Sequence, residues 1–197
     1  MSYLICVIIL ILILIIVMNF KKTRTNYFGS GKKISSKTLN KTLIVITNIL
    51  NKNNIDDWFI GYGTLLGIVR NNSCIDNDDD IDILINKFHK DKILNIFTKE
   101  KFKVEMNKSN FLRIHKENFA PIDFYLCDKI ENDYHDSWEN SIWKNVNPLV
   151  YYNWKGVILS LPKNPEQRLK NRYGKDWMIP KNSKGNTNRG KNKPGFI

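Results

Sequence analysis

A chain of 197 residues, 42% of them hydrophobic and 25% charged, is long enough to bury one hydrophobic core and short for two domains. Its formal net charge of +12 comes from two flanks. Residues 1–37 and 181–197 contain basic but no acidic residues, whereas residues 38–180 contain 20 basic and 19 acidic residues. A nearly neutral core argues against a nucleic-acid-binding domain, so we do not expect nucleic acid as a partner.

The N-terminus begins with sixteen uninterrupted apolar residues, from Tyr3 to Met18. Extended to Phe20, the run would form a helix of about 27 Å, slightly shorter than the hydrocarbon core of a bilayer. Two lysines follow, and their long side chains can reach the membrane interface. The run lacks the basic start and the small-residue cleavage site of a signal peptide. We therefore predict a single transmembrane anchor over residues 1–20 and a basic linker over 21–37.

Two sequence signals disagree about the side of the membrane. The basic flank after the apolar run favours a C-terminal domain in the cytoplasm, by the positive-inside tendency. Cys74 and Cys127, the only cysteines beyond the run, do not form a disulfide framework, which agrees with a reducing compartment. Glycosylation sequons favour the lumenal side instead, at Asn40, Asn71 and Asn107. We predict a single-pass membrane protein with a cytoplasmic domain, and the lumenal side is the alternative.

Between residues 38 and 180 the chain alternates helical and strand-like segments. Apolar residues at helical spacing predict helices, and period-two alternation predicts strands. We assign no element to the aromatic segment 128–150, and composition predicts a disordered basic tail over 181–197. The expected elements are a helix at 36–52, strands at 58–61 and 81–85, a helix at 87–99, strands at 102–106, 111–115 and 122–127, a hairpin at 151–161 and a helix at 166–173.

Five aspartates stand within seven positions, at Asp76, Asp78, Asp79, Asp80 and Asp82. Carboxylates this close repel one another unless they are solvated, protonated or neutralised by cations. If Ile81 points into a core, Asp80 and Asp82 project together from the opposite face of the strand. Such a pair suits Mg²⁺ or Mn²⁺, which prefer oxygen ligands. The alternative is a solvated acidic loop or a weak calcium site.

A glycine-rich run precedes these acids, with the sequence GYGTLLG from Gly61 to Gly67. We interpret it as a strand-like segment with a glycine turn. Gly63 would let backbone N–H groups approach an anion, Thr64 offers a hydroxyl, and Arg70 adds a fork-shaped donor suited to phosphate. A third acid is needed to complete a metal site, and Asp123 stands near the start of a later apolar strand.

The run GTLLGIVRNNSCIDNDDDIDI resembles the signature of the LicD/fukutin family, which belongs to the nucleotidyltransferase superfamily. A second, weaker similarity lies in LPKNPEQRLKNRYGKDWMIP, and the helix before Trp58 also fits. The resemblance as a whole covers about residues 38–180 and is weaker between Asp128 and Tyr152. One departure is that Asp76 and Asn77 stand where the family usually has Pro-Trp. This departure concerns the local packing and the fit of the donor rather than the metal site.

The resemblance implies a small α/β (α+β) fold, with a mixed sheet, flanking helices on one face and the acids at the open edge of the sheet. It implies transfer of a phosphorylated alcohol, such as choline phosphate or ribitol phosphate, from a CDP-linked donor to a hydroxyl of a glycan or glycoconjugate, with release of CMP. Mg²⁺ or Mn²⁺ would be the cofactor.

The resemblance also implies the site residues. Asp80, Asp82 and Asp123 would be the catalytic acids and metal ligands, and Asp78 would support them from behind. Gly63 and Thr64 would contact the donor phosphate. Arg70 would either bind phosphate or brace the acidic strand.

Two other functions remain open on the residues alone. One is a nucleotidyltransferase that uses a nucleoside triphosphate on a protein or nucleic-acid acceptor and releases pyrophosphate. The other is a membrane-tethered, non-catalytic protein that binds a cation or a partner. The roles of three tryptophans are also open, because a sugar site or the hydrophobic core could contain Trp138, Trp143 and Trp154.

Overall fold

The computed structural model describes residues 31–180, so the predicted anchor (1–20), most of the predicted linker and the predicted tail (181–197) lie outside the described residues. Between residues 31 and 180, no helix is long and apolar enough to cross a membrane. The elements in chain order are α2 (Ser36–Lys52), β1 (Trp58–Ile60), α3 (Tyr62–Asn71), β2 (Ile81–Asn86), the 3-10 helix η1 (Lys87–His89), α4 (Lys90–Lys99), β3 (Lys103–Asn107), β4 (Phe111–His115), β5 (Ile122–Ile130), β6 (Asp133–Asp136), β7 (Ser141–Trp143), β8 (Val150–Trp154), β9 (Val157–Leu161) and α5 (Pro165–Tyr173).

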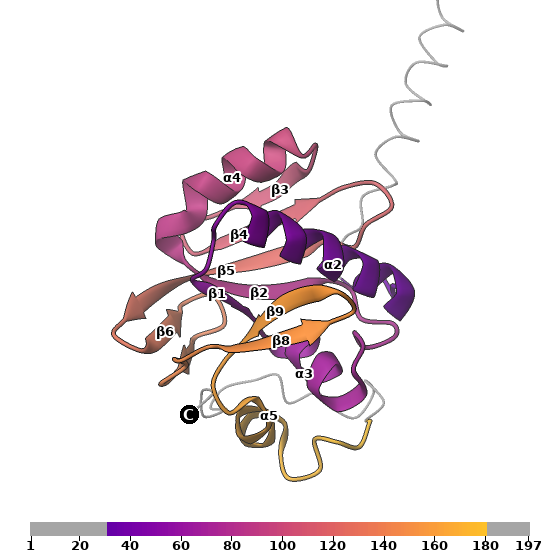
Figure 1. Cartoon of the computed structure of the whole chain (residues 1–197), viewed down its shortest axis with the longest axis vertical. Helices are drawn as coiled ribbons and strands as arrows, with labels where there is room; N and C mark the ends of the chain where they lie inside the picture. Colours follow the sequence, from indigo (N-terminus) through magenta and orange to yellow (C-terminus); the bar gives the residue numbers. More distant parts are fainter. Residues whose placement is uncertain (1–30, 181–197) are drawn as a thin grey trace, which may run out of the picture. The chain divides into compact units, whose positions relative to one another are not determined.

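A mixed sheet lies at the centre, with the strand order β1-β2-β5-β4-β3 (Figure 1). Strands β2 and β5 run parallel, whereas β1–β2, β4–β5 and β3–β4 are antiparallel pairs. The distal half of β5 pairs with β6, β6 pairs with β7, and β8 and β9 form a separate hairpin. In the parallel register Asp82 stands beside Asp123, so the two acids occupy neighbouring central strands.

One face of this sheet is apolar and is covered by helices. Ile83 of β2 stands beside Phe124 of β5, and the Phe124 ring lies 5.4 Å from the ring of Phe97 in α4. Helices α2 and α4 lie in front of the sheet in Figure 1. Because side chains alternate along a strand, Asp82 and Asp123 point to the other face. The acids therefore lie on two central strands, on the face away from α4.

The glycine-rich segment is a helix, and our interpretation of it as strand-like was wrong. Helix α3 begins after Gly61, ends at Asn72 in the left-handed region (φ 52°), and buries six of its ten residues. An added Cβ at Gly67 would lie 2.6 Å from the backbone oxygen of Ser73, so this glycine permits a close backbone approach. Burial of one helix face outweighs the helix cost of glycine, which is about 1 kcal/mol per residue.

Most of the other expected elements are present within a few residues of the expected bounds. Ser35 caps α2, the hairpin turns at Lys155–Gly156, and α5 begins at Pro165 and ends at Gly174. Two differences concern the region after β5. That strand runs on to Ile130, and β6 and β7 occupy the segment to which the sequence assigned no element.

Candidate active site

Three predicted acids meet on one face of the sheet. Asp82 and Asp123 stand in register on β2 and β5, and Asp80 precedes Asp82 by two positions and therefore shares its face. Asp82 and Asp123 are buried, with 5% and 2% of each residue exposed, and Asp80 is partly buried. The fold thus concentrates three carboxylates where water cannot solvate them fully, which requires compensation by donors, protons or cations.

The start of α3 supplies donors to one of these acids. Oδ2 of Asp82 accepts hydrogen bonds from the backbone N–H groups of Gly63 (2.9 Å) and Thr64 (3.3 Å). The backbone N–H of Asp82 donates to Oγ1 of Thr64 (2.9 Å), and the Tyr125 hydroxyl donates to Oδ1 of Asp82 (3.1 Å). The glycine-rich run thus holds the acidic strand, and its predicted contact with a donor phosphate stays a prediction.

Gly63 also leaves space for the acids. A Cβ at this position would lie 2.7 Å from Oδ2 of Asp78 and 3.4 Å from Oδ2 of Asp82. The absence of a side chain therefore lets both carboxylates approach the start of α3.

The donor set fits a hard divalent cation. Asp78, Asp79 and Asp80 each place a carboxylate oxygen within 4.8 Å of the others. Mg²⁺ and Mn²⁺ take such oxygen ligands, and a carboxylate that accepts hydrogen bonds keeps further lone pairs for a cation. Asp78, which we expected behind the ligands, lies among these oxygens, whereas Asp82 and Asp123 lie deeper in the sheet face. Which of these carboxylates bind a cation stays a prediction.

Electrostatics in the cluster favour a bound cation. Burial, and then the charges of Asp82 and Asp123, raise the pKa of Asp80 to about 10. Burial and Asp78 raise the pKa of Asp82 well above its usual range. Burial also raises the pKa of Asp123, although hydrogen bonds from Arg113 act to lower it. The cluster therefore has more negative charge than its neighbours neutralise, and a cation would displace protons from it.

Arg113 is a site residue that our sequence analysis missed. Its Nε donates to Oδ1 of Asp123 (2.5 Å), and its Nη2 donates to Oδ2 of Asp123 (2.5 Å) and to Oδ2 of Asp80 (3.2 Å). It stands opposite Asp123 in the β4–β5 register. The sequence does contain a signal, because Arg113 is a charged residue between the apolar residues Leu112 and Ile114 of a predicted strand.

Arg70 lies in the last turn of α3. Its Nε is buried without a hydrogen-bond partner, and burial lowers the pKa of its guanidinium. Among residues 31–180, the ion pairs to Asp80 and Asp123 come from Arg113. Arg113 thus performs the bracing that we offered as one role of Arg70, and phosphate binding by Arg70 stays a prediction.

Residues 31–36, just before and at the start of α2, attach to the acidic loop. The backbone N–H of Gly31 donates to Oδ2 of Asp79 (2.5 Å), and that of Ser36 donates to Oδ1 of Asp76 (2.9 Å). Ile34 is buried and forms a β-bridge with Asp78. Residues 31–36, which the sequence assigned to the linker, therefore help to position the candidate ligands.

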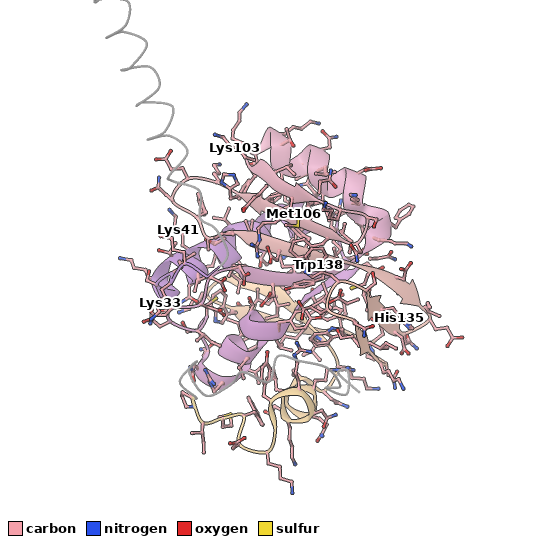
Figure 2. All side chains as sticks on the ribbon, turned by 180° about the vertical axis from the view of Figure 1, so that it is seen from behind. Lys33, Lys41, Lys103, Met106, His135 and Trp138 are labelled. Atoms are coloured by element: carbon pink, nitrogen blue, oxygen red, sulfur yellow. The ribbon has the colours of Figure 1, made fainter. Side chains whose placement is uncertain are left out.

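Aromatic side chains flank the acids on the same face. The Tyr62 ring lies 4.7 Å from the Tyr125 ring, and the Arg172 guanidinium of α5 lies 4.7 Å from Tyr62. Trp138 is 41% exposed and stacks on Phe111 at 4.3 Å and 15°. The view from behind in Figure 2 places Trp138 over the sheet.

The other two tryptophans that the sequence left open are core residues. Trp143 and Trp154 are buried, so neither offers a face to a sugar. Trp138 is therefore the one of the three that a ligand can reach.

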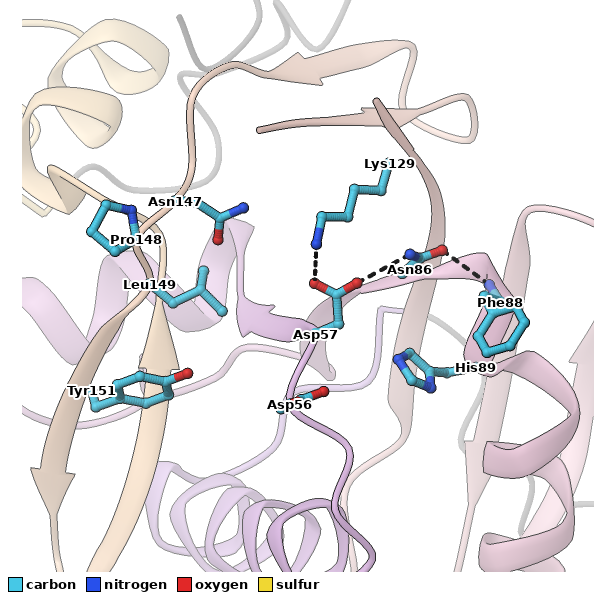
Figure 3. A pocket seen from close by; sticks show the side chains of 10 residues that line it. All are labelled: Asp56, Asp57, Asn86, Phe88, His89, Lys129, Asn147, Pro148, Leu149 and Tyr151. Carbon is cyan, nitrogen blue, oxygen red and sulfur yellow. Dashed lines mark hydrogen bonds and ion pairs between the residues drawn. The ribbon is translucent and has the colours of Figure 1, made fainter. Parts of the chain in front are cut away.

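A cavity of about 510 Å³ lies at the other end of β2, away from the acids (Figure 3). Asn86, the last residue of β2, lines it, and so does Asp57. The oxygens of Asp57 accept hydrogen bonds from Lys129 (2.8 Å), Asn86 (3.0 Å) and the Tyr134 hydroxyl. Burial acts to raise the pKa of Asp57, but these three bonds lower it overall. This carboxylate is fully paired within the protein.

The fold and the site define a nucleotidyltransferase-type domain: a mixed sheet with α2 and α4 on one face and, on the other, paired aspartates on adjacent strands with the start of α3 against them. The family model described as "LicD/FKTN/FKRP, nucleotidyltransferase domain" matches residues 55–164, more than half of the chain. The chain belongs to this family, as its resemblance to LicD and fukutin sequences predicted. The matched range contains every site residue that the sequence predicted.

Other proteins are similar to parts of this chain. A protein of Rickettsia typhi, "Uncharacterized protein RT0683", is 31% identical over 137 residues, which are 64% of this chain and 42% of that protein. The chain thus spans less than half of that relative. The lincomycin-bound lincosamide adenylyltransferase LnuA superposes with a TM-score of 0.48 at 16% identity, over 64% of this chain and 81% of that one. The antibiotic-resistance factor ANT(2'')-Ia gives 0.49 at 12% identity, over 64% and 66%.

Proposed function

We propose that the protein is a metal-dependent transferase. It moves a phosphorylated small alcohol, of the choline phosphate or ribitol phosphate type, from a CDP-linked donor to a hydroxyl of a glycan or glycoconjugate. The observation that carries the proposal is the register of Asp82 and Asp123 on two parallel strands, with Asp80 beside them and the start of α3 against Asp82. Family membership supports a nucleotide-dependent transferase, and the alcohol and the acceptor are the further step of the proposal.

In this proposal Asp80, Asp82 and Asp123 hold Mg²⁺ or Mn²⁺, with Asp78 beside them. When bound, the cation neutralises the charge of the donor's pyrophosphate and orients it. The absence of a side chain at Gly63 keeps the space in front of the acids open. The N-terminal end of α3 and the Arg70 guanidinium supply positive charge for the donor phosphates.

The transfer is an in-line displacement at the phosphorus that bears the alcohol. The acceptor hydroxyl forms the new O–P bond, the bond from phosphorus to the CMP oxygen breaks, and CMP leaves with that electron pair. Asp123 accepts the proton of the attacking hydroxyl in this proposal. Its position in register with Asp82, on the face where the donor would bind, supports that role, because a general base must lie within hydrogen-bond reach of the proton that it accepts.

We also propose that the N-terminal apolar run anchors the enzyme in a membrane. The run and its basic flank support an anchor with the domain in the cytoplasm, and the three sequons support the lumenal side as the alternative. Either placement fits an acceptor that is itself attached to a membrane.

The direct test uses the full chain with Mn²⁺ or Mg²⁺ and a panel of CDP-alcohols and nucleoside triphosphates. We expect metal-dependent release of CMP from one CDP-alcohol, and its loss in the Asp80→Ala/Asp82→Ala double variant. Release of pyrophosphate from a nucleoside triphosphate would support nucleotidyl transfer instead. A shorter chain for this assay should begin at or before residue 31, because Gly31 and Ser36 hold the acidic loop. No release from any donor, together with no cation binding, would contradict the proposal.

A further inference from the structure

Arg113 brings a positive charge into the group of carboxylates that would bind the cation. Its side chain is 12% exposed, and its Nη2 lies 2.5 Å from Oδ2 of Asp123 and 3.2 Å from Oδ2 of Asp80. One guanidinium thus bridges two of the three predicted ligands. A bidentate arginine–carboxylate pair fixes orientation as well as charge.

This placement has two opposite consequences for a divalent cation. The fork of hydrogen bonds holds the carboxylates of Asp123 and Asp80 in place, which favours binding. The positive charge of the guanidinium repels a divalent cation that approaches the same carboxylate oxygens, which disfavours cation binding. A unit charge and a doubly charged cation about 5 Å apart, at an effective dielectric constant of about 20, change an equilibrium constant on the order of 10,000-fold or more before relaxation. The charge effect is therefore the larger one, even after relaxation reduces it to about tenfold.

We propose that Arg113 is a positioning residue that lowers the cation affinity of the site and keeps the cation exchangeable. This inference rests on the proposed function, because it concerns the same cation. Without Arg113, the predicted ligands Asp80 and Asp123 would have no basic ion-pair partner among residues 31–180. A cation held by these carboxylates without a counter-charge would leave slowly, whereas a cation that travels with the donor's pyrophosphate must exchange in each turnover.

The test measures Mn²⁺ binding to the full chain in detergent micelles, from the loss of the electron paramagnetic resonance signal of free Mn²⁺. Arg113→Met removes the charge, and Arg113→Lys keeps the charge but loses the fork. Lys103→Met is the matched control, because it removes an exposed charge from the outer strand β3 of the same sheet (Figure 2). We expect Arg113→Met to bind Mn²⁺ at least about tenfold more tightly than the wild type. We expect Arg113→Lys to remain within about threefold of the wild type, and Lys103→Met to be unchanged.

Thermal unfolding with and without Mn²⁺ separates an altered site from a damaged fold. Arg113→Met leaves two buried carboxylates without their partner, so we expect a lower melting temperature that Mn²⁺ restores more strongly than in the wild type. Equal or weaker Mn²⁺ binding by folded Arg113→Met would overturn the inference. If Arg113→Met does not fold, Arg113→Gln decides, because it also removes the charge but keeps a hydrogen-bond donor: tighter Mn²⁺ binding supports a charge effect, and equal or weaker binding overturns it.

Failure of the inference and failure of the proposed function give different results. A wild type that binds Mn²⁺ and releases CMP, beside an Arg113→Met variant that binds no more tightly, overturns the inference alone. A wild type that binds no Mn²⁺ overturns the metal-dependent function and the inference with it.

Discussion

The two ends of β2 lie beside aspartates in opposite electrostatic situations: Asp57 precedes β1 and contacts Asn86 at one end, and Asp80 directly precedes β2 at the other. At the far end Asp57 accepts hydrogen bonds from Lys129, Asn86 and Tyr134, and its pKa is lowered overall. At the near end Asp80 and Asp123 share the guanidinium of Arg113. The pKa of Asp80 is raised to about 10. The sheet therefore balances charge completely at one end and leaves an excess of negative charge at the other.

This difference separates a structural acid from a functional one. A paired carboxylate stabilises the fold, because its ionised form gains more from its partners than it loses in desolvation. A cluster of buried carboxylates with excess negative charge costs stability, and such clusters are typical of functional sites. The cavity of about 510 Å³ lies beside the paired acid, so charge balance rather than the presence of a cavity identifies the site.

Among these variants, Asp82→Asn should have the largest effect on activity. An asparagine keeps an acceptor for the N–H groups of Gly63 and Thr64 and can donate to the Tyr125 hydroxyl, so the local fold should persist. We expect CMP release to fall on the order of 100- to 1,000-fold. Loss of a buried charge should leave the melting temperature equal or higher. A CMP release rate within threefold of the wild type would contradict this assignment.

The pH dependence of Asp82→Asn should have a definite sign. Burial raises the folded-state pKa of Asp82, so the folded wild type binds more protons than the unfolded chain above about pH 4. Wild-type stability should therefore fall as the pH rises from about 4 toward 8, and the advantage of the variant should grow over that window. Urea unfolding at several pH values in chelator measures it, and an advantage that shrinks with pH would oppose the raised pKa.

Two glycines of α3 allow an effect on activity to be separated from an effect on stability. A Cβ at Gly63 would meet the movable carboxylate of Asp78, whereas a Cβ at Gly67 would meet the backbone of Ser73. We expect Gly63→Ala to reduce CMP release about 10- to 100-fold with little change in stability, because the acids shift. Gly67→Ala should instead lower the free energy of unfolding by about 2–3 kcal/mol. Equal losses of stability in the two variants would argue against separate roles.

The sequence was sufficient for most of the fold because its strands and helices carry their own periodicity. The acidic strand, the β8–β9 hairpin and α5 follow from alternation, a Lys-Gly turn and a proline start. Helix α3 was missed because local glycines oppose a helix, and only its burial against the sheet outweighs them. Arg113 was missed because its partner Asp123 is ten residues away, and their contact exists only in the β4–β5 register.

Asp57→Asn tests the balanced end of β2. The variant loses the charge that Lys129 and the Tyr134 hydroxyl contact, so we expect a loss of about 1 kcal/mol in unfolding free energy at pH 7. Because hydrogen bonds lower the folded-state pKa, this contribution is present above about pH 4 and is lost as the pH falls through that pKa. The variant and the wild type should converge in strong acid. CMP release by the variant should match the wild type, and a loss comparable to that of Asp82→Asn would contradict the division between the two ends.

Trp138→Ala should give the smallest effect and tests whether the exposed ring beside the acids contacts a ligand. The ring already stacks on Phe111, and its remaining exposed surface lies on the face that carries Asp123. Stacking of a ligand ring on an aromatic side chain contributes about 1 kcal/mol, so we expect KM for donor or acceptor to rise about fivefold with kcat unchanged. Trp138→Phe should retain most of the affinity. Tyr151→Ala removes a ring that is 64% exposed beside the far cavity, and it should change neither constant. If Tyr151→Ala raised KM and Trp138→Ala did not, the ligand would contact the balanced end of β2 instead.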